Sequence, residues 1–345
     1  MAASPPRRRR PASRLILPVA IALGALVLAD TLAWGLAERR MDRLYAQWQA
    51  AQTAQGWRVA ASPPSRGGWP FAAGLDLRAV SLADASGLGW QADRVRLRVS
   101  LLHPLTLGIA AGGAQALLLG PAGRLPFTAA RLALSVPFFP DARTPQAALV
   151  AEGVRADLPG GALVLGRLRA ALAAPPALAV VASAANVTLP PAPGGTWPLG
   201  ARIATVSLDA GLTGAVPPGK DPAAQARAWR AAGGRLAVRR LALTWGRLDL
   251  TAQATLGLDA ALQPEGSGEV VLADPAALLD ALAAGHAITP QVEATARVVV
   301  GLLAPPPKPG VTPDLHLPLT LKDHLLTVGG VPVARLPDWH WPSAP

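Results

Sequence analysis

Apolar and polar residues alternate with a period of two along much of the chain after residue 56. The clearest run lies at 94–101, where Val95, Leu97 and Val99 alternate with arginine and serine residues. Similar runs occur at 75–78, 131–136, 241–245, 248–258 and 315–321. A period of two places successive side chains on opposite faces of a strand. These runs therefore predict strands with one apolar and one solvated face, which is typical of antiparallel sheets.

Turn residues and helix caps divide the alternating runs. Gly246-Arg247 and the stretch 322–324 each predict a hairpin turn. Three short helices are predicted where a capping residue precedes proline, at 221–233, at 274–285 and from Thr289-Pro290 onward. The third stays open between helix and strand, because its three consecutive valines also suit a strand. The predicted fold is mainly β with a few short helices, with extended or curved antiparallel sheets behind one N-terminal transmembrane helix.

The segment from Leu15 to Ala37 is apolar, with Asp30 as its only charged residue. At about 1.5 Å per residue, a helix of this length would cross a hydrocarbon core of about 30 Å. Five arginines lie in the tail 1–14, so the positive-inside rule predicts a cytoplasmic N-terminus and a periplasmic bulk. A single-pass inner-membrane anchor is thus expected, with a cleaved signal peptide as the alternative. Asp30 and Trp34 are expected near the outer membrane interface.

Residues 38–55 contain no proline or glycine and continue the helical pattern. Met41, Leu44, Tyr45 and Trp48 follow the i, i+3, i+4, i+7 spacing of an amphipathic helix. This apolar stripe is expected to pack on the domain that follows, and the membrane surface is the alternative.

Composition limits the class of protein. Hydrophobic residues make up 51% of the 345 residues and charged residues 15%, which excludes a globally disordered chain. The 34 glycines and 36 prolines disfavour a long helical bundle. The absence of cysteine excludes a disulfide framework and a thiol nucleophile. Residues 56–345 are expected to form a β-rich extracytoplasmic domain, with the proline- and glycine-rich stretch 190–196 as the candidate linker between two sub-modules.

The net charge of +11 invites a nucleic-acid partner. However, five of the positive charges precede the apolar segment, and the remainder are spread over the rest of the chain. No concentrated basic patch is apparent, so no nucleic-acid binding is predicted.

No catalytic motif is found. The five histidines are dispersed, without the spacing of a metal site. The stretch 214–220 reads GAVPPGK and has the spacing of a phosphate loop. Asp221 replaces the magnesium-binding Ser or Thr, and Pro217 and Pro218 remove two backbone N–H donors that the loop must offer. No nucleotide, metal or cofactor is expected, and the chain is not expected to be an enzyme.

Several loose motifs occur in a distinctive order. They are the N-terminal anchor, Gly68-Trp69-Pro70-Phe71, Trp90 with Ala92-Asp93, His103-Pro104, Trp245-Gly246, and the ending from Leu317-Pro318-Leu319 through Pro332-Val333 to Leu336-Pro337. From about residue 30 onward, this order resembles the uncharacterised alphaproteobacterial family known as domain of unknown function 2125. The resemblance implies a membrane-anchored, extracytoplasmic protein, and it implies no catalytic residues.

Two functional hypotheses follow. The first is a periplasmic binding module that handles lipid or another apolar envelope component on a leucine- and valine-rich sheet face. The candidate face consists of Leu75, Leu77, Val95, Leu97, Val99, Leu132 and Leu134. The second is a structural or interaction scaffold of the cell envelope, with a closed β core and no ligand. A groove without a second layer would favour the first hypothesis, whereas a two-sheet core would favour the second.

The C-terminal residues Trp339 and Trp341 stand out in a chain with ten tryptophans but only four phenylalanines and one tyrosine. They are expected to close the end of the last sheet. A tail that contacts the membrane interface or a partner is the alternative.

Overall fold

The computed structural model describes residues 13–69, 72–100, 102–137, 146–173, 178–192, 195–214, 221–285, 289–303 and 314–341. The basic tail up to residue 12, the stretch 215–220 and His286 lie outside these residues. The helices are α1 (Ser13–Ala54), α2 (Pro222–Ala231), α3 (Pro275–Ala284) and α4 (Pro290–Leu303), with a 3-10 turn at Gly120–Ala122.

The strands begin immediately after α1. They are β1 (Arg58–Ala60), β2 (Ser65–Gly67), β3 (Ala72–Ala83), β4 (Leu88–Ser100), β5 (His103–Leu119), β6 (Arg124–Thr128), β7 (Arg131–Pro137), β8 (Gln146–Leu158), β9 (Gly161–Ala173), β10 (Leu178–Thr188), β11 (Arg202–Thr213), β12 (Arg235–Trp245), β13 (Leu248–Leu258), β14 (Pro264–Ala273), β15 (Leu315–Lys322), β16 (Leu325–Val328) and β17 (Val331–Arg335).

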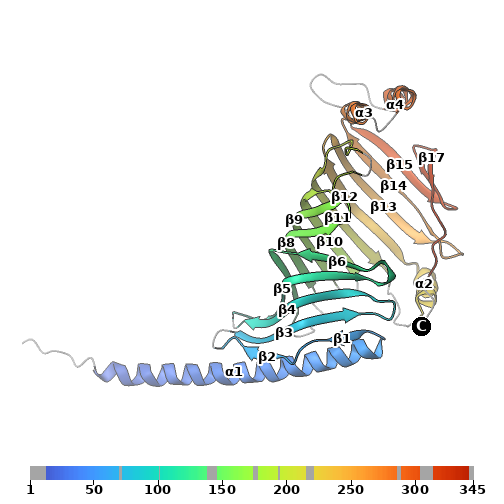
Figure 1. The fold of residues 1–345 in the computed structure, drawn as a ribbon. Coiled ribbons are helices and arrows are strands. Elements are labelled where there is room, and N and C mark those ends of the chain that lie inside the picture. The colour runs from blue at the N-terminus through green and yellow to red at the C-terminus, as the bar shows by residue number, and fades with distance from the viewer. Residues whose placement is uncertain are drawn as a thin grey trace, which may run out of the picture.

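All described strands belong to one antiparallel sheet. Strands β1 and β2 pair with the same edge of β3, and each longer strand then pairs with the next along the chain as far as β17. The short strand β6 pairs with β5 and β8 beside β7. Figure 1 shows the sheet rising from α1 and curving, with α3 and α4 at its top and α2 near the C-terminus. The predicted mainly β, antiparallel fold with short helices is confirmed.

The strand register aligns apolar residues into two rows that cross the sheet. The first row, from β3 to β15, is Leu75, Leu97, Ile109, Leu134, Leu149, Ala170, Ala182, Leu208, Leu241, Ala252, Val270 and Leu317. The second row is Leu77, Val95, Ala111, Leu132, Ala151, Leu168, Ala184, Val206, Leu243, Leu250, Leu272 and Leu315. Directly paired residues share a face, so these rows form one continuous apolar surface, which we call the inner face.

The opposite surface, the outer face, is charged. Ion pairs join neighbouring strands there, as between Asp76 and Arg96 at 3.1 Å and between Glu152 and Arg167 at 3.6 Å. These side chains are between 34% and 56% exposed, so solvent screens the pairs and they add little to stability. The charged groups keep the outer face hydrated. The apolar side chains of the sheet are concentrated on the inner face.

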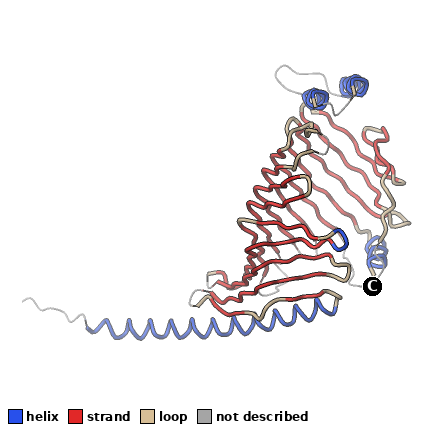
Figure 2. The backbone as a smooth tube through the Cα atoms, viewed as in Figure 1, coloured by secondary structure: helices blue, strands red, loops and turns tan. Residues whose placement is uncertain are grey.

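Helix α1 covers one end of the inner face. It packs on β1 and β3, where Met41, Leu75, Val99 and Ala73 form a buried cluster. The tube view in Figure 2 shows α1 running beneath the first strands, whereas no described second sheet faces the remainder. From β5 to β14, every Leu, Ile and Val of the two rows is only half-buried. The closed two-sheet core of the scaffold hypothesis is not formed by the described residues.

The apolar N-terminal segment lies within α1, a helix of 42 residues. A search of the described residues finds no helix that is long and apolar enough to cross a membrane. Within this apolar segment, four large apolar side chains that the structure describes are exposed: Val27, Leu28, Leu32 and Leu36.

The local predictions for turns and helices are confirmed. Strands β12 and β13 meet at Gly246-Arg247, and β15 and β16 meet at Asp323-His324. Asp221 caps α2, its Oδ1 accepting from the backbone N–H of Ala223 at 2.9 Å. The segment after Thr289, which the pattern left open, is the helix α4. Around the predicted linker 190–196, β10 and β11 pair directly, so the sheet continues across this stretch.

Candidate binding site beneath helix α1

A cavity of about 550 Å³ lies between α1 and the inner face of the first strands. Its walls are Met41, Leu44, Tyr45 and Trp48 of α1, Val59 of β1, Leu77, Val80 and Leu82 of β3, Trp90, Val95 and Leu97 of β4, Leu107 and Ile109 of β5, and Leu134 and Val136 of β7. Every lining residue is aliphatic, aromatic or methionine, and none carries a charge at neutral pH. The volume is within the range of about 300–1,000 Å³ that is typical of small-molecule sites.

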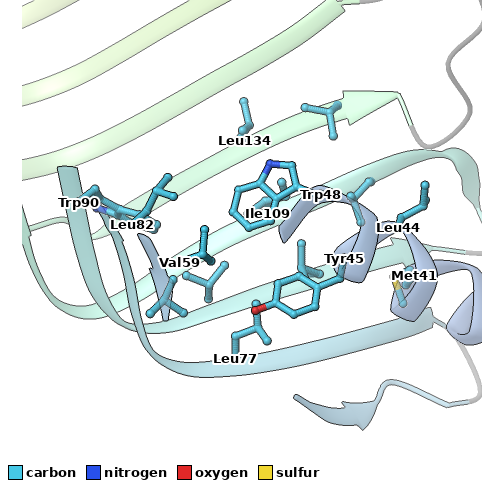
Figure 3. Close-up of a pocket in the computed structure, with 15 residues that line it drawn as sticks. Met41, Leu44, Tyr45, Trp48, Val59, Leu77, Leu82, Trp90, Ile109 and Leu134 are labelled. Atoms are coloured by element: carbon cyan, nitrogen blue, oxygen red, sulfur yellow. The ribbon is translucent and has the colours of Figure 1, made fainter. Parts of the chain in front are cut away.

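Helix α1 supplies one wall of the cavity through the stripe expected from its spacing. In Figure 3, Tyr45 and Trp48 project from the helix toward the sheet, with Ile109 and Leu134 on the facing strands. The two rings stack, with centroids 6.2 Å apart and planes at 28°. Burial raises the pKa of the Tyr45 hydroxyl above its usual value. This hydroxyl can act as a hydrogen-bond donor. The expectation that this stripe packs on the following domain is confirmed.

A backbone irregularity brings additional side chains into the cavity. Leu77 and Val80 are three residues apart in β3, yet both line it. Between them, Ala79 adopts a left-handed conformation with φ of 51°, which breaks the alternation of faces. On the neighbouring strand, Asp93 Oδ2 accepts from the backbone N–H of Ala114 at 2.7 Å, at a register shift between β4 and β5. Because of these irregularities, residues from both halves of β3 and β4 line the same cavity.

The seven residues of the predicted sheet face all lie on the inner face, but they differ in their surroundings. Leu77, Val95, Leu97 and Leu134 line the cavity. Leu75 and Val99 lie instead in the buried cluster with Met41, at 1% and 6% exposure. Leu132 is half-buried in the second row, outside the cavity.

Sequence reasoning missed several lining residues of the sheet, namely Val59, Val80, Leu82, Trp90, Leu107 and Ile109, whereas Val136 lay on the apolar face of the predicted strand 131–136. Strict alternation from Leu77 would have placed residues 79 and 81 on the inner face. No residue in this stretch is a glycine that would have signalled the left-handed turn, so the shift of face was hidden.

The contact between α1 and β2 contains polar side chains whose hydrogen-bonding groups are not all paired. Glu38 is 4% exposed, and its Oε1 has no hydrogen-bond partner among the described residues. Desolvation raises the pKa of its carboxyl, an effect that the nearby Arg66 partly offsets. Arg66 itself pairs with Asp42 at 2.5 Å. Trp34 packs against the Met41 cluster, and Asp30 is half-buried.

Titratable side chains elsewhere do not assemble into a reactive centre. Glu269 and His316 form an exposed pair on the outer face at 2.7 Å, and the hydrogen bond from His316 lowers the pKa of Glu269. No group of three or more His, Asp or Glu residues suited to a metal occurs in the part of the chain that the structure describes. The cavity beneath α1 therefore offers apolar contacts and no ionisable group in its walls, apart from the hydroxyl of Tyr45.

The C-terminal tail returns to the turn between β13 and β14. The backbone N–H of Trp339 donates to Gln263 Oε1 at 2.7 Å, and Trp341 Nε1 donates to the carbonyl oxygen of Leu262 at 3.1 Å. The two indoles meet edge to face, with centroids 6.2 Å apart. These contacts fasten the segment after β17 to one end of the sheet.

A family model described as "Uncharacterized protein conserved in bacteria (DUF2125)" matches residues 34–337. The chain belongs to this family. The match covers the amphipathic part of α1 and the whole sheet and ends two residues after β17, so the cavity and both apolar rows lie within the family region. No match was found among curated proteins or among solved structures.

Proposed function

We propose that this protein is a membrane-anchored periplasmic binding module that holds the acyl chain of a lipid, or another apolar envelope component, against its inner face. The observation that carries the proposal is the pair of apolar rows, which run unbroken across twelve strands of a single sheet. At about 4.8 Å between strands, these rows extend for about 50 Å. An apolar surface of this length needs a cover, and α1 provides one only at its first end.

The chemistry of the inner face favours a hydrocarbon ligand. The cavity beneath α1 has no charged residue in its walls, which disfavours a polar metabolite. Burial of each methylene contributes about 0.8 kcal/mol. Ten methylenes against the inner face would therefore contribute on the order of 8 kcal/mol before the cost of ordering the chain.

A membrane location provides the source of such a ligand. The basic tail and the apolar segment from Leu15 to Ala37 favour a single-pass inner-membrane anchor with a cytoplasmic N-terminus. Leu28, Leu32 and Leu36 support this placement, because they are exposed on one side of α1 at intervals of four residues. Lipid is the natural cover for such a stripe.

Site-specific photocrosslinking of the full chain in bacterial membranes tests the binding proposal. p-Benzoylphenylalanine is placed at Leu208, which lies in the first row on β11 and is half-buried. The matched control is its neighbour Ser207, which points to the outer face. We expect lipid adducts, identified by mass spectrometry of the crosslinked peptide, from position 208 and none from position 207.

Two results would contradict the proposal. Equal lipid adducts from both positions would mean that the inner face has no preference for lipid. Protein adducts alone from position 208 would instead support the envelope-scaffold hypothesis, because a partner would then cover the inner face.

A further inference from the structure

Three exposed apolar side chains gather at one end of the sheet. Leu102 is 85% exposed, the highest value among the large apolar residues that the structure describes, and Leu105 and Trp69 are 66% and 53% exposed. Leu102 lies in the turn between β4 and β5, where Ser100 pairs with His103. Trp69 lies in the connection from β2 to β3. The two connections are adjacent, because Ala72, the first residue of β3, pairs with Ser100.

The direction of α1 places this end of the sheet toward the N-terminal half of the helix. Tyr45 packs near Leu77 and Val95, in the middle of their strands. One turn earlier, Met41 joins Ala73 and Val99, which are one residue from the ends of β3 and β4. Toward its N-terminus, α1 therefore leaves the sheet on the side of Trp69 and Leu102. Figure 1 shows it extending well beyond the strands on that side.

The end of the apolar segment coincides with the end of the sheet. Ala37, its last residue, packs against the cluster that contains Ala73. Trp69 lies four residues before Ala73, and Leu36 one residue before Ala37. A helix that leaves the bilayer at Ala37 therefore brings the three exposed side chains to the level of the lipid headgroups.

We infer that Trp69, Leu102 and Leu105 form a second membrane contact, which dips into the outer surface of the bilayer beside the anchor. Tryptophan and leucine at an interface bury apolar surface in the headgroup region. Exposed arginines flank the contact, with Arg39 and Arg43 on α1 and Arg98 on β4, and these would attract anionic headgroups. Two contacts fix the orientation of the domain, whereas a helix alone would leave it free to tilt. The inference rests on the proposed anchor and names the bilayer as its partner.

Fluorescence of the full chain in vesicles of phosphatidylethanolamine and phosphatidylglycerol tests this inference. The chain contains no cysteine, so Leu102→Cys introduces a single site for a nitrobenzoxadiazole label. The matched control is Ala85→Cys, an exposed position in the turn at the other end of β4. The thirteen residues of β4 separate the two labels by about 40 Å.

We expect the label at position 102 to shift to shorter wavelength and to be quenched by lipids carrying a doxyl group. The label at position 85 should remain accessible to aqueous iodide. If the chain floats with the vesicles but both labels remain equally accessible to iodide, the second contact is wrong and the anchor stands. If the chain does not float with the vesicles at all, the anchor and the second contact both fail.

Discussion

Two regions of the inner face share one sequence pattern but have different environments. On β3 and β4, Leu75, Leu77, Val95 and Val99 are 1–6% exposed beneath α1. On β11 and β12, Leu208 and Leu241 stand in the same row and are only half-buried. Alternation therefore determines which face a side chain occupies, and the covering element determines how much it contributes to stability. The comparison separates residues that pack beneath α1, some of which also line the cavity, from residues that no described element covers.

The largest effect is expected from truncating a leucine of the covered end. Leu75→Ala leaves a cavity in the cluster with Met41, and should lower the free energy of unfolding by about 2–5 kcal/mol. Leu208→Ala removes the same atoms from an uncovered strand and should cost about 1 kcal/mol. Urea unfolding of the full chain in detergent measures both variants. Equal losses would show that the two regions are equally packed, which would contradict the comparison.

Replacing a small residue of the inner face by a larger one tests the same difference in packing. Ala73, 4% exposed, lies beneath α1, so Ala73→Phe should overpack the cluster and cost about 1–3 kcal/mol. Ala170 lies on β9 between Leu149 and Ala182, where no described element covers it. Ala170→Phe should therefore change stability by less than about 0.5 kcal/mol. A large loss at position 170 would indicate that something covers this part of the inner face.

Glu38 should make the covered end sensitive to pH. Its pKa is raised in the folded chain, so the folded state binds the proton more tightly than the unfolded state does. Its contribution to stability is thus greatest below the ordinary pKa of 4.5 and falls as pH rises through the folded pKa. We expect Glu38→Gln to raise the thermal midpoint at pH 7 and to have little effect at pH 4. The exposed Asp157→Asn is the control, and a benefit of Glu38→Gln that is greater at pH 4 would contradict the assignment.

The smallest effect is expected on the outer face. Asp209 pairs with Arg239 across strands, with side chains 39% and 50% exposed. Because water and salt screen such a pair, Asp209→Ala should leave the urea midpoint unchanged within error. A clear decrease in the urea midpoint would mean that ion pairs on the outer face also contribute to stability.

The sequence by itself determined the mainly β, antiparallel class, the two unlike faces of the strands with clear alternation, two hairpin turns and the capped helices. Each of these depends on neighbours a few residues apart, such as the alternation at 94–101 or the capping carboxylate of Asp221. Four of the seven residues proposed for the binding face do line the cavity. The amphipathic stripe of α1 was likewise visible in its spacing.

Only the tertiary structure decided what covers the inner face. A period of two indicates that a strand has one apolar face, but it does not indicate what packs on that face. Leu75 and Leu208 therefore follow the same sequence pattern, although only Leu75 is buried. The left-handed Ala79 and the register shift beside Asp93 brought Val80 and Trp90 to the cavity. Burial and register depend on contacts between residues far apart in the chain, which no local spacing encodes.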